Sequence, residues 1–473
     1  MREIGSILNG TVVPPGTVRE VRSPYDGRVV TRVTVADEAI VARAIDNSLG
    51  ARATMAALAP YERAEILERF SATVVAHRDE LAQLLCEEAG KPITLAKIEA
   101  ERCAQTIADA AHWARYYEQE ILGLDASPVG AGRQGIIRRF PVGVVAAITP
   151  FNFPLNLVAH KIAPAIAAGC PVVLKPASQT PSTGFRLAQL AMEAGLPKEG
   201  IQVVLASGSD AGRMITDSRV ALVTFTGSAE VGWQIKALCG KKKVALELGG
   251  NAAAIVEPDA DRETAARKIA TGGFGYAGQS CISVQRVFVH ESIAARFTDA
   301  LVAAADATPY GDPSDPKTVC GPLIDKSNVE RVSQWIERAV ARGGRVLTGN
   351  KVQGSVHAPT VLTHVPGNCE VSCAEVFGPV VVVATYDSFD QALGMVNDSR
   401  YGLQAGIFTN DFRKIWKAYE TIEVGGAIHN DVPTFRVDMM PYGGAKDSGM
   451  GREGARWAIQ EMTEPRLLVL STR

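Results

Sequence analysis

The segment VGVVAAITPFNFPLNLVAHKIAPAIAAGCPVVLKP (residues 142–176) decides the fold class. Its two ends, VGVVAAI (142–148) and VVLKP (172–176), are apolar runs with the length of buried strands. Between them, HKIAPAIAAG is helix-like and stops at Gly169. A strand, a helix and a second strand in this order predict a βαβ unit with parallel strands.

The same alternation continues toward the C-terminus. IQVVLA (201–206) and VALVTFTG (220–227) are further strand-like runs, and helices are expected to open near Ser178 and Ser228. After Gly249-Gly250 a second series begins, and it comprises NAAAIVEP (251–258), a helix from Asp261, CISVQRVFVH (281–290) and a helix from Glu291. The first forty residues predict short strands, and residues 37–120 predict helices. We therefore expect an α/β protein with two units and a boundary near 246–250.

Composition excludes several classes of function. The chain has 473 residues, of which 47% are hydrophobic, so it can bury a large core. Its 49 basic and 51 acidic residues give no electrostatic reason to expect nucleic acid or membrane as a partner. No stretch approaches the ~18 apolar residues of a membrane helix, and no secretory signal is evident. Eight scattered cysteines and seven dispersed histidines predict a cytoplasmic chain with neither disulfides nor a metal site.

Two segments could carry binding or nucleophilic chemistry. Phe225-Thr226-Gly227-Ser228 ends a strand and opens a helix, where unpaired N–H groups favour a phosphate. The alternative is an ordinary turn capped by Ser228. Gly278-Gln279-Ser280-Cys281 follows a glycine-rich stretch, where an accessible thiolate is a good nucleophile. The alternative is a buried structural cysteine.

Two polar residues could assist such a cysteine. Glu247 lies between two leucines, where desolvation would raise its pKa toward that of a general base. The alternative is a solvent-facing glutamate on an edge strand. Asn152 lies between two prolines and could donate to a developing oxyanion. The alternative is a cap for the following helix.

Together these segments resemble the NAD(P)-dependent aldehyde dehydrogenase superfamily. The resemblance extends from the helical N-terminal region to PYGGAKDSGMGREG (441–454) and rests on six segments in family order: TPFNFP (149–154), LKPAS (174–178), FTGS (225–228), LELGGN (246–251), GQSC (278–281) and EVFGP (375–379). It implies a Rossmann-like cofactor domain (1–118 and 142–246), a catalytic α/β domain (247–445) and a small β oligomerisation element (119–141 and 446–473). A homodimer or homotetramer is therefore expected.

The resemblance also implies a catalytic mechanism. Cys281 would attack the aldehyde to form a thiohemiacetal, and transfer of hydride to the nicotinamide would leave a thioester. Asn152 and the backbone N–H of Cys281 would form the oxyanion hole. Glu247 would be the general base, and its presence favours water over coenzyme A as the acyl acceptor.

The remaining family positions imply a cofactor site and a substrate tunnel. The cofactor-binding positions are Thr149, Phe151, Lys175, Ser178, Gly208, Gly212, Phe225, Gly227, Ser228, Leu248, Glu375 and Phe377. Strict NAD users often carry Glu where this chain has Ser178, so we expect NADP to be accepted, with or without NAD. The tunnel positions are Phe153, His160, Ser280, Ile282 and Phe435.

The substrate class is less defined than the reaction. NLVAHKIAPA (156–165) and TFRVDMMPYGG (434–444) resemble the branch that contains lactaldehyde and phosphonoacetaldehyde dehydrogenases, which predicts a small polar aldehyde with His160 as a contact. His160 could instead be a packed histidine. A succinate-semialdehyde-type enzyme, a broad aldehyde scavenger and a relative that has lost catalysis are the alternatives.

Overall fold

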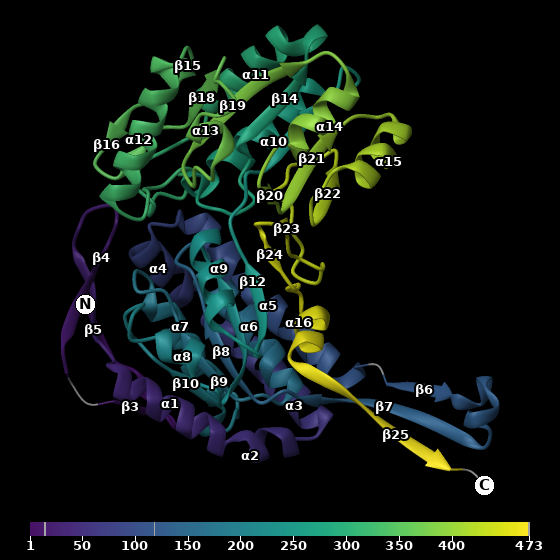
Figure 1. Ribbon diagram of the computed structural model, residues 1–473. Helices are drawn as coiled ribbons and strands as arrows, with labels where there is room; N and C mark the ends of the chain where they lie inside the picture. The colour runs from purple at the N-terminus through teal and green to yellow at the C-terminus, as the bar shows by residue number, and fades with distance from the viewer. Residues whose placement is uncertain (14–15, 118, 472–473) are drawn as a thin grey trace.

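The computed structural model describes residues 1–13, 16–117 and 119–471 and contains two large sheets, one above the other in Figure 1. The first sheet has eight strands in the order β24-β12-β11-β8-β9-β10-β2-β3. Its strands are β24 (Gly449–Met450), β12 (Lys243–Glu247), β11 (Val220–Thr226), β8 (Val144–Ile148), β9 (Val172–Lys175), β10 (Ile201–Val203), β2 (Ile7–Leu8) and β3 (Thr11–Val12).

The five central strands of this sheet, β12 to β10, are parallel. Strand order reverses between β8 and β11, because the chain runs outward from β8 to β9 and β10 and later returns to β11 on the other side. In open α/β sheets, ligands bind at such a reversal, beyond the carboxyl ends of the strands. TPFNFP (149–154) and FTGS (225–228) both lie at these ends.

Helices surround this sheet. They are α1 (Glu38–Gly50), α2 (Arg52–Ala57), α3 (Pro60–Ala76), α4 (Arg78–Ala89), α5 (Ile93–Tyr116), α6 (Asn156–Ala168), α7 (Pro181–Glu193), α8 (Gly212–Thr216), α9 (Ala229–Leu238) and α16 (Ala455–Glu461). Every residue of α6 is buried, since α5 and α16 pack on it. Two glycines, Gly90 and Gly169, end α4 and α6 in the left-handed conformation, which glycine adopts without steric cost.

The second sheet has seven strands in the order β15-β18-β19-β14-β13-β21-β22, with only β15 antiparallel. These strands are β15 (Arg345–Thr348), β18 (Thr360–Thr363), β19 (Val380–Tyr386), β14 (Arg286–His290), β13 (Ala253–Val256), β21 (Gln404–Phe408) and β22 (Gly426–His429). Its helices are α10 (Arg262–Phe274), α11 (Ala294–Asp306), α12 (Lys326–Ala341), α13 (Glu370–Cys373), α14 (Phe389–Asn397) and α15 (Phe412–Thr421).

The second series of predicted elements differs from the structure at one place. CISVQRVFVH suggests a strand from residue 281, but β14 begins only at Arg286. Residues 281–285 form a loop that closes the cavity described below, so their apolar side chains pack without joining the sheet.

Smaller elements complete the chain. A three-stranded sheet, β1 (Arg2–Ile4), β5 (Val29–Thr34) and β4 (Val18–Arg22), lies along the side of the molecule (Figure 1). Short pairs are β16 (Val352–Gln353) with β17 (Val356–His357), and β20 (Tyr401–Gly402) with β23 (Ala445–Lys446). Single 3₁₀ turns span Leu124–Ala126, Pro128–Gly130, Lys198–Gly200, Gly275–Gly278 and Glu291–Ile293.

An arm extends from the lower part of the molecule (Figure 1). It is a three-stranded antiparallel sheet, β25-β7-β6, made of β6 (Glu120–Gly123), β7 (Arg133–Pro141) and β25 (Thr463–Ser471). The expected oligomerisation segment 446–473 contributes only β25 to the arm, because β24 joins the eight-stranded sheet and α16 packs on α6. The domain boundary expected at residue 118 lies outside the described residues.

Candidate active site

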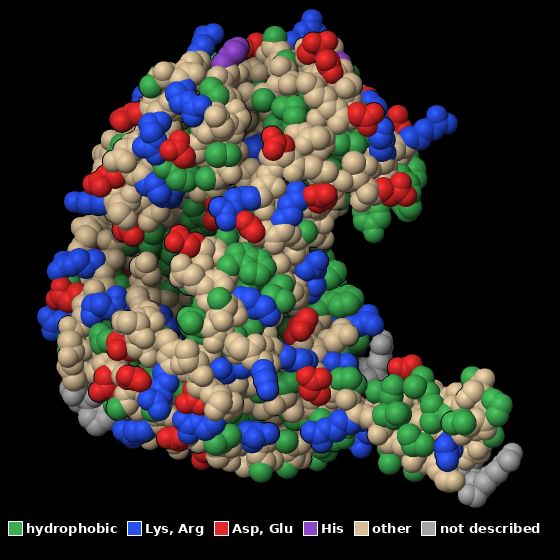
Figure 2. Space-filling view, viewed as in Figure 1, with side chains coloured by type: hydrophobic (Ala, Val, Ile, Leu, Met, Phe, Trp, Pro, Cys, Tyr) green, Lys and Arg blue, Asp and Glu red, His purple; other side chains and the backbone are tan. Residues whose placement is uncertain are grey.

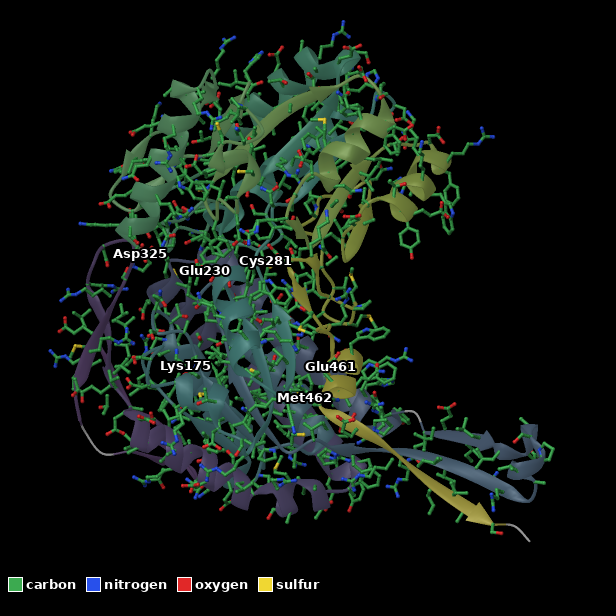
Figure 3. All side chains as sticks on the ribbon, in the orientation of Figure 1. Lys175, Glu230, Cys281, Asp325, Glu461 and Met462 are labelled. Carbon is green, nitrogen blue, oxygen red and sulfur yellow. The ribbon has the colours of Figure 1, made fainter. Side chains whose placement is uncertain are left out.

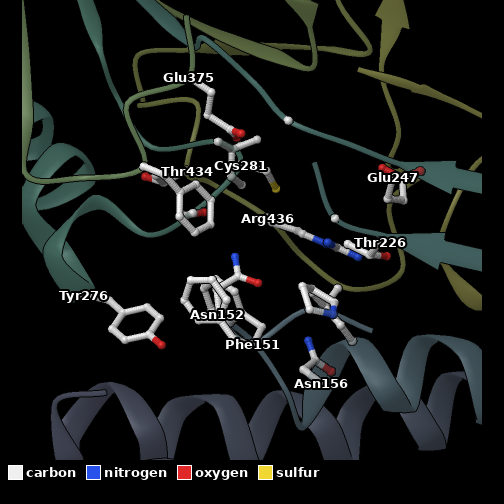
Figure 4. Close-up of a pocket in the computed structure, with 18 of the residues that line it drawn as sticks. Phe151, Asn152, Asn156, Thr226, Glu247, Tyr276, Cys281, Glu375, Thr434 and Arg436 are labelled. Atoms are coloured by element: carbon white, nitrogen blue, oxygen red, sulfur yellow. The ribbon is translucent and has the colours of Figure 1, made fainter. Parts of the chain in front are cut away.

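A cavity of about 700 Å³ lies between the parts of the chain built on the two large sheets, and Cys281 lines it. Figure 3 labels Cys281 between these two parts. Its lining combines the loop after β8, the start of α9, the end of β12 and the loop before β14. Figure 4 shows Asn152, Glu247, Cys281 and Arg436 around this space. The structure thus gathers residues that are far apart in sequence, including the three expected catalytic residues.

The loop before Cys281 has an unusual backbone. Tyr276 and Ala277 have φ angles of 53° and 55°, which non-glycine residues seldom adopt. Gly278 has φ 66°, and a Cβ there would lie 2.2 Å from the carbonyl oxygen of Gly378. The Gln279 amide donates to Tyr276 O and Pro322 O and accepts from Ile324 N. These bonds hold the loop in a fixed shape.

The run GFGYAG (273–278) has the G-x-G-x-x-G spacing of the dinucleotide-binding motif of Rossmann folds, but it lies at a different position in this fold. That motif follows a strand and opens a helix. Here the run closes α10 and leads to the cysteine. Its glycines therefore serve the loop geometry.

Cys281 is held as a neutral thiol. Its Sγ lies 2.8 Å from the hydroxyl oxygen of Tyr442, whose ring lies 3.7 Å below the guanidinium of Arg436. Burial raises the pKa of the Cys281 thiol to about 12, although the Tyr442 bond and the charge of Arg436 oppose this rise. A thiol with this pKa needs a base to become a nucleophile.

Two carboxyl groups with opposite pKa shifts lie near the end of β12. Burial, and then the neighbouring charge of Glu453, raise the pKa of Glu247 well above its usual value. Its Oε2 is buried and has no hydrogen-bond partner among the described residues. Glu453 is also buried, but Lys161 and Arg436, each 3.2 Å away, help to hold its pKa at about 2. Separated pKa values of this kind favour Glu247 for proton transfer and Glu453 as a fixed charge.

Asn152 is oriented by its neighbours. Its Nδ2 donates to the carbonyl oxygen of Gln279 at 3.1 Å, and its buried Oδ1 has no partner among the described residues. One amide hydrogen is thus used to fix the side chain beside the cysteine loop. Because Nδ2 carries two hydrogens, the second is free for a negative oxygen at Cys281.

Two arginines reach the same cavity and were not identified from the sequence. Arg102 on α5 forms two bonds to Asp438, at 2.7 and 2.9 Å. Arg436 bonds to Glu453, and its buried Nε lies 3.8 Å from Asp438 Oδ1 and has no hydrogen-bond acceptor among the described residues. Single arginines outside a motif carry no local signal. The segments quoted for the resemblance contained Tyr442, Arg436 and Glu453, but nothing in them showed that these residues converge.

His160 and Phe435 do not line the cavity, whereas Phe153, Ser280 and Ile282 do. The ring of His160 is fully buried, with Nε2 2.9 Å from Asp438 Oδ1 and 3.0 Å from Arg436 Nη2. This geometry does not support a direct contact between His160 and the substrate, because Asp438 and Arg436 lie against the ring. Phe435 is exposed, and its neighbour Arg436 faces the cavity in its place.

Residues expected to bind the nicotinamide half of the cofactor line the other end of the cavity. The ring of Phe151 meets that of Phe377 edge to face at 5.8 Å. Glu375 accepts from Gly250 N at 2.9 Å, and burial raises its pKa to about 7. Gly227, Ser228 and Leu248 also line this end, beside the N-terminus of α9, where a pyrophosphate is favoured.

The remaining expected cofactor residues lie outside the lining of this cavity. Thr149 and Phe225 are buried near the ends of β8 and β11, and Lys175 ends β9 with Ser178 three residues later. A Cβ at Gly208 or Gly212 would meet no atom within 4 Å, so open space adjoins both. This space beside β9 and α8 is where the adenosine half is expected.

None of the described helices combines the length and apolarity needed to cross a membrane. Within residues 1–13, 16–117 and 119–471 there is no group of three or more His, Cys, Asp or Glu side chains suited to a metal ion.

Comparison with known proteins identifies the family of this chain. The pattern of the aldehyde dehydrogenase family matches residues 13–468. The 3-sulfolactaldehyde dehydrogenase of Priestia aryabhattai is 42% identical over 472 residues, covering 100% of this chain and 98% of that protein.

Two solved structures are closely similar. The crystal structure of aldehyde dehydrogenase 21 from Physcomitrella patens, in complex with the reaction product succinate, has TM-score 0.97 and 41% identity, covering 100% of this chain and 98% of that one. Glyceraldehyde-3-phosphate dehydrogenase from Methanocaldococcus jannaschii, complexed with NADP, has TM-score 0.92 and 37% identity, covering 96% and 98%. The chain therefore belongs to the aldehyde dehydrogenase family and is an NAD(P)-dependent oxidoreductase that acts on aldehydes.

Proposed function

We propose that the protein oxidises a short aldehyde that carries an anionic group, and that it releases a free carboxylic acid. The observation that carries this proposal is the pair of guanidinium groups, Arg102 and Arg436, in the wall of the cavity that holds Cys281. Arginine binds carboxylates, sulfonates and phosphates through parallel hydrogen bonds.

The charges at this end of the cavity leave a positive excess. Arg102, Arg436 and Lys161 face two charged carboxylates, Asp438 and Glu453. Burial, and then the charge of Arg436, lower the pKa of His160, which disfavours a positive charge on its ring. A substrate anion would neutralise the excess and supply an acceptor for the buried Nε of Arg436.

The similar proteins support the same chemistry. The named aldehyde of the Priestia aryabhattai relative carries a sulfonate, and the product bound to the Physcomitrella patens structure carries a second carboxylate. In both proteins the reacting carbon is a few bonds from an anion. The cavity described here has the cationic wall that such a molecule requires.

Each catalytic residue would have a defined task. Glu247 takes the thiol proton as Cys281 Sγ bonds to the aldehyde carbon, and Asn152 donates to the oxygen of the resulting thiohemiacetal. Bound NAD(P)⁺ supplies the hydride acceptor. Glu247 then releases the first proton to solvent and takes a second one from the water that attacks the Cys281 thioester. Breakdown of the tetrahedral adduct releases the acid and a Cys281 thiolate, to which Glu247 returns the proton.

A substrate panel with matched variants tests the proposal. Wild-type kcat/KM is expected to be higher for succinic semialdehyde and 3-sulfolactaldehyde than for glycolaldehyde, propanal or hexanal. Arg102→Ala should lower kcat/KM for the anionic aldehydes by about 10–100-fold and leave propanal within about threefold. Lys97→Ala is the control, since Lys97 is an exposed cation on the same helix and pairs with Asp79.

The outcomes separate the alternatives. Because Arg102→Ala removes two hydrogen bonds from Asp438, Arg102→Lys provides a variant that keeps the charge and should retain part of the preference. A preference for glycolaldehyde would favour a small neutral hydroxyaldehyde, and equal rates on all aldehydes would indicate a scavenger. If Cys281→Ala did not abolish NAD(P)H formation, the covalent mechanism would be wrong.

We also propose that two or more copies associate through the arm. Among the described residues, strand β25 pairs only with β7, and four consecutive side chains, Leu467 to Leu470, are 39–56% exposed. Figure 2 shows apolar side chains concentrated on the arm. An apolar edge strand of this length favours pairing with another chain.

A further inference from the structure

A second group of basic side chains lies outside the catalytic cavity. Lys175 ends β9 and is only 7% exposed, and its Nζ donates a long hydrogen bond, 3.5 Å, to the carbonyl oxygen of Pro176. Buried ammonium groups ordinarily have a carboxylate partner. Among the described residues, no Asp or Glu oxygen lies within 4.0 Å of this Nζ.

A cation from a distant part of the chain lies beside it. Arg19 belongs to β4, and its Nη2 donates to the carbonyl oxygen of Ser178 at 2.8 Å. This bond connects the N-terminal three-stranded sheet to the loop that follows Lys175. Burial, and then the charge of Arg19, lower the pKa of Lys175 to about 8, so the two cations are close enough to repel each other.

Nothing within the described chain neutralises this pair. The guanidinium of Arg19 also has no carboxylate oxygen within 4.0 Å among the described residues. Glu88 is the carboxyl group whose charge acts on Arg19, but it is fully buried and bonded to Thr31 and Ser182. Burial raises the pKa of Glu88, although its bonds to Ser182 and Thr31 oppose this rise. The structure therefore holds two cations and the Ser178 side chain in one place without an anion.

We propose that Arg19 is a specificity-determining residue that binds the 2′-phosphate of NADP. The proposal rests on the placement of the adenosine ribose at Lys175, which is part of the proposed cofactor site. A 2′-phosphate is a dianion that would accept hydrogen bonds from Arg19 and Ser178 and offset the repulsion between Arg19 and Lys175. NAD has only a hydroxyl at that position and gains none of this charge pairing.

The position of Arg19 in the fold makes this role specific. The guanidinium of Arg19 comes from the three-stranded N-terminal sheet and reaches the loop that follows β9. The side chain is therefore not needed for packing within the βαβ unit and is available to bind a phosphate. One Nη group is used to hold the side chain against Ser178 O, and the other nitrogens remain as donors. A planar group fixed at one corner is suited to bidentate contact with phosphate.

Binding of cofactor fragments to the full-length enzyme tests the proposal without catalysis. Isothermal titration would compare 2′,5′-ADP with 5′-AMP, which differ only in the 2′-phosphate. Wild type should bind 2′,5′-ADP more tightly. Arg19→Ala should raise the Kd for 2′,5′-ADP by about 10–100-fold and change the Kd for 5′-AMP by less than about twofold. Arg19→Lys should restore part of the loss, because it keeps one charge.

Arg22→Ala is the matched control, since Arg22 lies on the same strand and pairs with Glu20 instead. It should leave both Kd values unchanged. Equal weakening of both ligands by Arg19→Ala would show that Arg19 only supports the loop, and a change below about threefold for 2′,5′-ADP would show no phosphate contact. Either result overturns the proposal. Failure of wild type to bind 5′-AMP would refute the ribose placement, and none of these outcomes depends on the aldehyde panel.

Discussion

At the scale of single residues, Glu247 and Glu453 show how two like side chains can take different roles. Both are buried, yet Glu453 has Lys161 and Arg436 beside it, while Glu247 has an oxygen without a partner in the described chain. Removing the base should leave acylation chemistry partly intact and block the release of product. We expect Glu247→Gln to slow thioester hydrolysis by about 10²–10⁴-fold.

The measurement is the mass of the intact enzyme during turnover, in which the acyl group should accumulate on Cys281. Since the pKa of Glu247 is raised, its basic form grows with pH, so wild-type hydrolysis should rise with pH through that pKa, and the variant should lose this rise. Glu464→Gln is the control, because Glu464 is half-exposed and pairs with Lys243 at the other end of β12. Normal hydrolysis by Glu247→Gln would assign the base to another group.

At the scale of elements, the contact between α5 and the start of α6 fixes the loop that carries Asn152. Glu99 on α5 accepts from the backbone N–H groups of Leu155 and Asn156, and its other oxygen pairs with buried Lys91. The first N–H groups of a helix otherwise have no partner. Glu99→Gln should lower the free energy of unfolding by about 3–5 kcal/mol, since it leaves Lys91 buried and unpaired.

The loss should depend on pH. Burial lowers the pKa of Lys91 to about 8 even with Glu99 beside it, and without Glu99 that pKa should fall further. In the folded variant Lys91 then loses its proton at a lower pH than it does in the unfolded chain, so the stability of the variant rises with pH. The difference in unfolding free energy between the variant and wild type should therefore shrink as the pH approaches about 8. Thermal unfolding at several pH values measures this. Glu101→Gln is the control: Glu101 is also on α5 and forms an exposed ion pair with Arg78 of α4, so this change should lower the free energy of unfolding by less than about 0.5 kcal/mol.

The elements were predictable wherever a local pattern determined them. The apolar runs at β8, β9 and β11 and the glycines after α4 and α6 are properties of consecutive residues, so sequence alone locates them. The strand expected from residue 281 failed because apolar residues also pack in loops. Sequence alone could not show that His160 is buried behind the cavity while Arg436 lines it. Which of the two faces the cavity depends on how residues 434–442 pack against α6, and this contact is between distant parts of the chain.

At the scale of the whole molecule, the arm is the part whose apolar side chains stay exposed in a single chain. It projects from the body (Figure 1), and Leu467 to Leu470 on β25 are exposed apolar side chains that alternate between its two faces. Figure 2 shows apolar side chains gathered on the visible face of the arm. We expect wild type to have a solution mass of two or four times 50.2 kDa by light scattering. Leu468→Glu, at a side chain that is 56% exposed, should shift this mass toward a single chain, because a buried charge without a partner disfavours the interface.

Folding within one chain should survive this substitution, since β25 keeps its pairing with β7 over residues 463–471. Circular dichroism should therefore be unchanged while the mass falls. Val75→Glu is the control, because Val75 is 61% exposed on α3, away from the arm, and its mass should match wild type. A wild-type mass of one chain, or an unchanged mass in Leu468→Glu, would contradict association through the arm and would leave the apolar face of β25 unexplained.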